Sequence, residues 1–398
     1  MSKKKAAPTS FNLGLVLLFA FAHLGHHLPG ALIVPLSPFI RDHFDLDYTR
    51  SGWVVSAYLI CYGISQLPGG WLSDRIGPRT LITIGISGVA IAGLLAGLSV
   101  NYIMLLAFLA LAGILGGGYH PSSVPLISGF TVSEKRGRAL GIHQIGGAAS
   151  HFLGPLIASA LVIVWGWRGA FIAPAILIFF LGIVLNVLIK KKTGPRTDNN
   201  SLANDHLPVR PHSKISRHLI AFMIFAIVAD LLIASTVVFI PLFLVDHFQF
   251  SDKAAAATLA VVYSGGLWAG PLSGYFSDRV GSLPVLLFVT LLACPIIFFF
   301  NIIPLGWGIY IFLFILGIGQ FARMPVNEIY LINNIPERHR STILGIYYFG
   351  SRGGPGVVAP LIGFIADHFG FGVSFGAIGI ILFIVTVCCS LFIWKDKA

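Results

Sequence analysis

A short polar motif that occurs twice limits how this chain can fold. The stretch 70–79, GWLSDRIGPR, interrupts two long apolar runs, and the stretch 274–281, GYFSDRVG, repeats it. Asp74 and Asp278 are 204 residues apart in a chain of 398. The same offset relates Asp42-His43-Phe44 to Asp246-His247-Phe248, Pro121 to Pro325, Gly141 to Gly345, and Gly166 to Gly370. A repeat of about half the chain predicts two copies of one folding unit.

The apolar runs between these polar segments are about twenty residues or longer, which is enough to cross a bilayer as helices. Only 10% of the residues are charged, against about 25% in soluble proteins. Because lipid cannot satisfy backbone hydrogen bonds, such runs must be helical. We therefore predict an all-α polytopic membrane protein of two pseudo-symmetric six-helix bundles. Its twelve spans are expected at 12–36, 51–72, 80–98, 104–130, 139–164, 168–190, 218–244, 254–276, 283–302, 306–333, 341–366 and 371–394.

The basic residues predict the orientation of the spans. With both termini on one side, that side carries twenty Lys and Arg residues and the opposite side carries four. An excess of Lys and Arg marks the cytoplasmic side, so we expect both termini in the cytoplasm and the protein in the plasma (inner) membrane. The net charge of +11 is thus a topology signal, and we expect no nucleic-acid partner.

The domain boundaries follow from one long hydrophilic segment. It contains three prolines and scattered basic residues, which is typical of a flexible linker. We predict an N-terminal six-helix bundle at 1–190, a cytoplasmic linker at 191–217 and a C-terminal six-helix bundle at 218–398.

Twelve spans, two similar halves, a basic linker and the repeated loop motif resemble the major facilitator superfamily. The resemblance covers the whole chain, although Pro78 takes a usually basic place and the second copy loses the trailing basic residues. It implies that the motif is a latch that clamps the cytoplasmic ends of the halves in one state and releases them in another. The expected latch residues are Gly70, Asp74, Arg75, Gly77, Arg79, Asp278, Arg279 and Glu328, where Glu328 is expected to pair with Arg279 or Arg338. The alternative is a solvated loop with positive-inside charges.

A Gly-rich run in span five, 141–155, resembles the Gly-Pro motif of the drug:proton antiporter branch. That branch usually carries an arginine in span four, which here has no Arg or Lys. The ionisable side chains near that level are Tyr119 and His120. The proton relay of the branch therefore cannot be transferred to this chain.

Ionisable side chains at membrane depth are costly and usually face a cavity. Asp230 and its counterpart His26, 204 residues apart, are a candidate protonation pair; the alternative is a structural pair of Asp230 with Arg352. Arginines suit carboxylate, phosphonate or phosphate, so we expect Arg323 or Arg352 to touch substrate. The alternative for both is neutralisation by Asp230 or Glu328. The candidate substrate-binding residues are His23, His26, His120, Tyr119, Arg323 and Arg352.

His23, His26 and His27 share one helix face. That spacing could bind a metal, but we expect one or two of them to line the cavity instead. No metal, cofactor or catalytic residue is therefore predicted.

These features favour a secondary active transporter that moves a small organic anion or amphiphile by alternating access, coupled to protons as a symporter or antiporter. We expect a monomer in lipid whose partners are the solute and protons. Multidrug efflux by proton antiport is an alternative, and a membrane-embedded metal enzyme is a third reading that lacks an acid beside the His pair of span one.

Overall fold

The computed structural model describes residues 12–132, 135–193, 216–303, 306–335 and 340–394. Those residues are nearly all helical and include no strand. Eight helices are long and apolar enough to cross a membrane. When α3 and α11 are added, and α8 and α15 are divided at Gly166 and Gly370, twelve spans result. The predicted twelve-helix architecture is confirmed.

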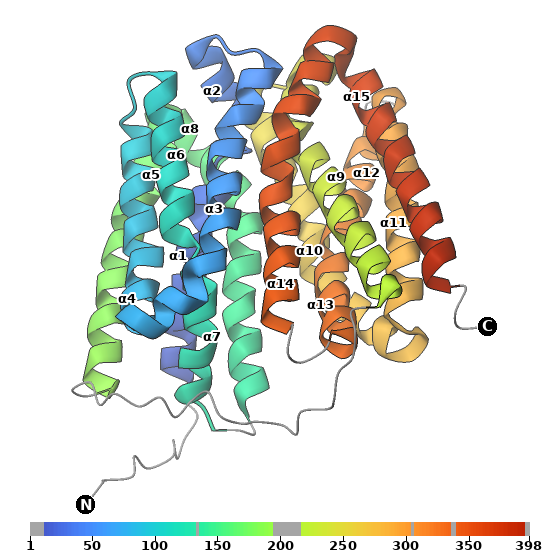
Figure 1. Ribbon diagram of the computed structural model, residues 1–398. Coiled ribbons are helices and arrows are strands. Elements are labelled where there is room, and N and C mark those ends of the chain that lie inside the picture. The colour runs from blue at the N-terminus through green and yellow to red at the C-terminus, as the bar shows by residue number, and fades with distance from the viewer. Residues whose placement is uncertain (1–11, 133–134, 194–215, 304–305, 336–339, 395–398) are drawn as a thin grey trace, which may run out of the picture.

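The two sets of helices lie side by side, blue to green on the left and yellow to red on the right of Figure 1. The first set comprises α1 (Leu13–Ala31), α2 (Ser37–Phe44), α3 (Tyr48–Ile76), α4 (Pro78–Thr83), the π-helix η1 (Ile84–Gly88), α5 (Val89–Gly97), α6 (Tyr102–Gly116), α7 (Tyr119–Gly129) and α8 (Arg136–Thr193). The second comprises α9 (Arg217–Phe248), α10 (Asp252–Val280), α11 (Ser282–Phe298), the 3-10 helix η3 (Phe300–Ile302), α12 (Trp307–Phe321), α13 (Arg323–Asn334), α14 (Arg340–Tyr348), the π-helix η5 (Phe349–Gly353) and α15 (Gly354–Trp394). The predicted linker lies almost entirely outside the described residues.

The backbone repeats at the same offset as the sequence. Residues with positive φ are uncommon and favour glycine. Three pairs of them are 204 residues apart: Asp45 and Gln249 (φ 52° and 56°), Gly77 and Gly281 (88° and 92°), and Gly166 and Gly370 (65° and 78°). The chain therefore turns in the same way at equivalent places in the two copies, which confirms the duplication.

The two motif helices, α3 and α10, each have 29 residues. Their N-termini are capped by equivalent residues: Asp47 accepts from the backbone N of Arg50, and Ser251 accepts from that of Ala254. Both helices start at the end of the bundle that holds Asp246, here called the Asp246 end. Their C-termini therefore lie together at the opposite end, the Asp74 end, which carries both motif carboxylates.

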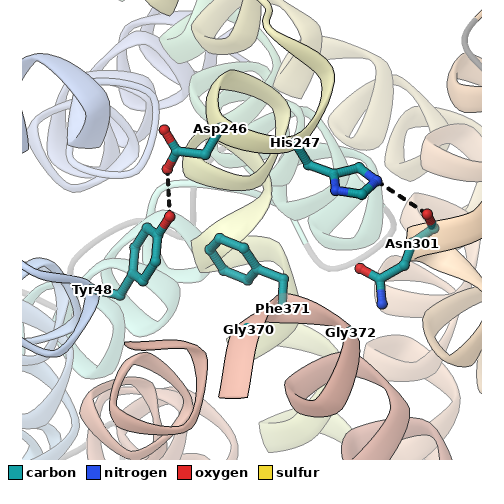
Figure 2. A pocket seen from close by; sticks show the side chains of 7 residues that line it. All are labelled: Tyr48, Asp246, His247, Asn301, Gly370, Phe371 and Gly372. Carbon is teal, nitrogen blue, oxygen red and sulfur yellow. Dashed lines mark hydrogen bonds between the residues drawn. The ribbon is translucent and has the colours of Figure 1, made fainter. Parts of the chain in front are cut away.

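A group of polar side chains joins the two sets of helices at the Asp246 end. Asp246 accepts hydrogen bonds from Arg41 and from the Tyr48 hydroxyl, the latter at 2.7 Å (Figure 2). Asp367 accepts from the Tyr48 and Thr49 backbone N atoms at 2.9 and 3.0 Å. We call these five residues the clasp, and it closes this end of the molecule.

The Asp74 end differs. Asp74 and Asp278 are exposed, and neither forms an ion pair with any other residue that the structure describes. The two sets of helices are thus hydrogen-bonded to each other at the Asp246 end, whereas Asp74 and Asp278 make no ion pair with a described residue at the Asp74 end.

Small residues bring α3 into direct contact with the helices that follow α14. A Cβ atom added at Gly63 would lie 2.8 Å from the Cα of Gly353. The Ser56 hydroxyl donates to the Gly356 carbonyl oxygen at 2.5 Å. Small residues are what permits such close approach in membranes. We call this contact of α3 with η5 and α15 the seam.

Candidate functional site

A buried ion pair lies inside the second half. The Nε atom of Arg323, at the start of α13, donates to Oδ1 of Asp230 in α9 at 2.8 Å. The guanidinium also donates to the Thr290 hydroxyl and to the Ala226 carbonyl oxygen. Arg323 is 0% exposed, so in this structure its charge is fully enclosed by protein groups.

The other carboxylate oxygen of Asp230 is also bonded. It accepts from the Tyr347 hydroxyl at 3.0 Å and from Nδ2 of Asn327 at 3.3 Å. The structural pairing of Asp230 with Arg352 that the sequence left open is not formed. Instead, neutralisation of Arg323 by Asp230, the other alternative, holds in this structure.

The first half contains a cluster of six histidines from α1, α7 and α8. This histidine cluster comprises His23, His26, His27, His120, His143 and His151, with ring centroids of neighbours 4.1–5.6 Å apart. Within it, His26 stacks on Tyr119 at 4.2 Å and donates from Nδ1 to the Gly85 carbonyl oxygen at 2.7 Å. The predicted residues His23, His26, Tyr119 and His120 are thus brought together.

The two groups occupy equivalent places in the two copies. The offset of 204 relates His26 to Asp230, Tyr119 to Arg323 and His143 to Tyr347. The stack of His26 on Tyr119 therefore stands where the second half has its ion pair. Equivalent positions of the two copies therefore hold an ion pair in one half and a stacked His–Tyr pair in the other.

A break between α6 and α7 positions Tyr119 and His120. Gly117 and Gly118 separate a helix that packs on α3 from one that packs on α4. A Cβ at Gly117 would lie 2.5 Å from the backbone carbonyl carbon of Ser65, so no larger residue fits there unless the backbone shifts. The close packing fixes the start of α7, and with it the direction of both side chains toward α1.

Arg352, in η5, differs from Arg323 because it has no ion-pair partner among the described residues. Its only hydrogen bond there is from Nη2 to the Met324 sulfur at 2.8 Å, and a thioether is a weak acceptor. It is partly exposed and interacts electrostatically with His120, His151 and Glu328. It is therefore a positive charge available to a bound anion.

Glu328 does not form the pair that the sequence predicts. Its Oε1 accepts from the Tyr348 hydroxyl at 3.0 Å, while Arg279 lies over the Tyr275 ring at 4.4 Å. Arg338 lies outside the described residues. The pair with Arg279 is thus absent in this structure because each residue has a nearer partner.

The other latch residues lie together at the Asp74 end. Arg75 lies over the Trp71 ring at 4.4 Å, as its counterpart Arg279 does over Tyr275. Gly77 ends α3, Arg79 is partly exposed, and a Cβ at Gly70 would meet no atom within 4 Å. A role as a latch stays a prediction for all of them.

Sequence reasoning missed Tyr347 and Asn327, which hold Asp230, and did not assign His143 to the site. A signal for Tyr347 existed: it is the counterpart of His143 at the repeat offset. Asn327 has no such signal, because its counterpart Ser123 has different chemistry.

Comparisons with known proteins agree with this fold. A family model described as the Major Facilitator Superfamily matches residues 19–326 and 222–398. The multidrug resistance protein MdtG of Proteus mirabilis is 27% identical, over 88% of this chain and 89% of the relative. The cis,cis-muconate transport protein of Acinetobacter baylyi is 25% identical, over 96% and 94%.

Solved structures give the same fold. A bacterial homologue of the human lysosomal transporter Spinster, in an inward-facing and unoccupied conformation, superimposes with a TM-score of 0.74 at 15% identity, covering 96% of both chains. A peptide transporter POT in complex with sulfate has a TM-score of 0.76 at 14% identity, covering 98% of this chain and 96% of the other.

Proposed function

Because this chain belongs to the Major Facilitator Superfamily and is a secondary transporter, we propose that its solute is a small organic anion, or an amphiphile bearing one. One observation carries this proposal: Arg352 lies at membrane depth, and no described residue forms an ion pair with it within 4.0 Å, although Glu328 interacts with it electrostatically. A fixed charge there is costly unless something neutralises it. A guanidinium binds carboxylate, phosphonate or phosphate in a planar, two-bonded geometry.

Asp230 is the proposed protonation site. Its carboxylate is the counter-charge of the enclosed Arg323 guanidinium. Protonation would remove that counter-charge, and an unpaired buried charge costs several kcal/mol. The hydrogen bonds between Asp230 and Arg323 would then break, or an anion would bind Arg323 in place of the carboxylate. Either change links proton binding to solute binding. A proton role for His26 stays a prediction. Direct contact of Arg323 with substrate also stays a prediction, because the Arg323 side chain is fully buried in this structure.

The placement in the membrane is part of the same proposal. The charge bias of the sequence supports a plasma-membrane protein with the Asp74 end and both termini in the cytoplasm. We propose the bundles at 1–190 and 218–398 as the moving halves, with 191–217 as their linker and a monomer as the working unit. The clasp would then close the outer face, and the solute would enter or leave at the Asp74 end.

A second candidate is multidrug efflux by proton antiport. The relative named a multidrug resistance protein covers 88% of this chain, and the relative named for muconate covers 96%. Coverage therefore does not separate them. The unpaired arginine favours an anion, whereas hydrophobic cations would be repelled by it.

Transport by purified protein in proteoliposomes separates these candidates. We expect saturable, pH-gradient-driven transport of an anion from a panel of carboxylates and phosphonates, and none of hydrophobic cations. Arg352→Ala should abolish it while Arg352→Lys retains part, because lysine keeps the charge but not the planar fork. Asp230→Asn should end the response to the pH gradient. Cation transport that survives Arg352→Ala would favour efflux.

A further inference from the structure

The histidine cluster contains three imidazoles that converge. One nitrogen from each of His23, His27 and His120 lies within 4.8 Å of the other two. The Nε2 atoms of His27 and His120 are 3.1 Å apart. His23 and His27 are one helical turn apart on α1, and His120 comes from α7. We propose that these three residues bind one divalent transition-metal ion, such as Zn²⁺ or Co²⁺.

The surroundings of His23 support this assignment. Its Nδ1 lies 2.8 Å from the His143 carbonyl oxygen, and because a carbonyl only accepts, Nδ1 must carry the proton. Nε2 therefore presents a lone pair. His23 is 2% exposed, and Nε2 has no hydrogen-bond partner. A histidine that donates its other N–H to a backbone carbonyl is the usual arrangement at metal sites.

The distances fit a metal after a small closure. Zn²⁺ binds histidine nitrogen at about 2.0–2.1 Å, so tetrahedral ligands lie about 3.4 Å apart. The His27 and His120 Nε2 atoms are 3.1 Å apart as a hydrogen-bonded pair, so on metal binding the proton between them must move to another ring nitrogen or leave, and the two atoms must separate by about 0.3 Å. The largest separation must shorten by about 1.4 Å, which side-chain rotation can supply.

The ligand set also predicts which metals bind and what remains open. Three neutral imidazoles suit Zn²⁺, Co²⁺, Ni²⁺ or Cu²⁺ rather than the oxygen-seeking Mg²⁺ or Ca²⁺. Three protein ligands leave a fourth position for water or another donor. Arg352 interacts electrostatically with His120, so an anion is the favoured donor. This inference does not depend on which solute is carried.

The test uses the full chain, purified through a tag without histidine. On titration with Co²⁺ we expect one ion bound per chain and the visible d–d bands of tetrahedral cobalt. His27→Gln and His120→Gln should each lower the affinity at least tenfold, because glutamine can keep a hydrogen bond but is a poor ligand. His368→Gln, at an exposed histidine outside the cluster, is the matched control and should bind as wild type.

X-ray absorption at the zinc edge gives a second measurement that needs no variant. Wild-type protein loaded with one equivalent of Zn²⁺ should show three imidazole nitrogens at about 2.0 Å. Weak binding at several sites, a ligand set without three imidazoles, or unchanged affinity in both glutamine variants would overturn the proposal.

Discussion

Asp230 and Arg323 form an ion pair whose guanidinium is fully buried and whose carboxylate is 15% exposed, and this arrangement has a measurable consequence. Removing one partner of a buried pair leaves an uncompensated charge and costs about 3–5 kcal/mol. We therefore expect Asp230→Asn and Arg323→Gln to lower the thermal stability of the protein in detergent strongly. The loss of stability in the double variant should be smaller than the sum of the losses in the two single variants.

Asp278→Asn is the matched control for this cycle, because Asp278 is exposed and makes no ion pair with the described residues. Its stability should stay close to that of wild type. Strictly additive losses in the double variant would contradict a direct interaction between the two charges.

Single residues also show what the sequence could and could not predict. The repeat offset identified His26 as the counterpart of Asp230. Sequence reasoning offered both Arg323 and Arg352 as partners of Asp230 and could not choose between them, because the approach of α13 to α9 depends on how whole helices pack. The rule that intramembrane charges are functional singled out both arginines equally. Only the structure distinguishes the enclosed Arg323 from the accessible Arg352.

The motif helices make a prediction at the scale of one element. Gly77 and Gly281 end α3 and α10 with φ of 88° and 92°, a region where a side chain is strained by about 1–3 kcal/mol. We expect Gly77→Ala and Gly281→Ala to lower the unfolding temperature measured in detergent.

Gly70→Ala and Gly274→Ala serve as controls, since both glycines lie inside the same helices and a Cβ there meets no atom within 4 Å. Alanine should be neutral or stabilising at these positions by about 0.5–1 kcal/mol. An equal decrease in unfolding temperature at all four sites would show that the positive φ at the helix ends is not the reason for glycine there.

Helices were predictable because length and apolar composition determine them in a bilayer, and the twelve spans follow from that. Their internal breaks were less predictable. The separation of α6 from α7 at Gly117 and Gly118 and the π-helical turn that carries Arg352 depend on neighbouring helices as well as on local sequence. The first irregular segment directly precedes Tyr119 and His120, and the second contains Arg352. These three candidate residues are therefore positioned by helix irregularities that the apolar pattern does not predict.

At the scale of the whole molecule, the two halves are joined by the clasp at one end and meet along a seam of small residues. The clasp contains an ion pair and hydrogen bonds that are accessible to water, and such bonds are individually weak. They can therefore open without a large loss of free energy. The contacts between α3 and α15 can persist while the two halves separate first at one end of the molecule and then at the other. Alternating access requires this motion.

Distances between spin labels at both ends test this motion most directly. In a background without the four native cysteines, one pair replaces Arg50 and Ala254 at the Asp246 end, and another replaces Thr80 and Pro284 at the Asp74 end. Each pair is related by the offset of 204. On changing pH or adding solute, we predict that the distance at one end grows while that at the other shrinks. Both distances changing in the same sense, or neither changing in a protein that transports, would contradict the account.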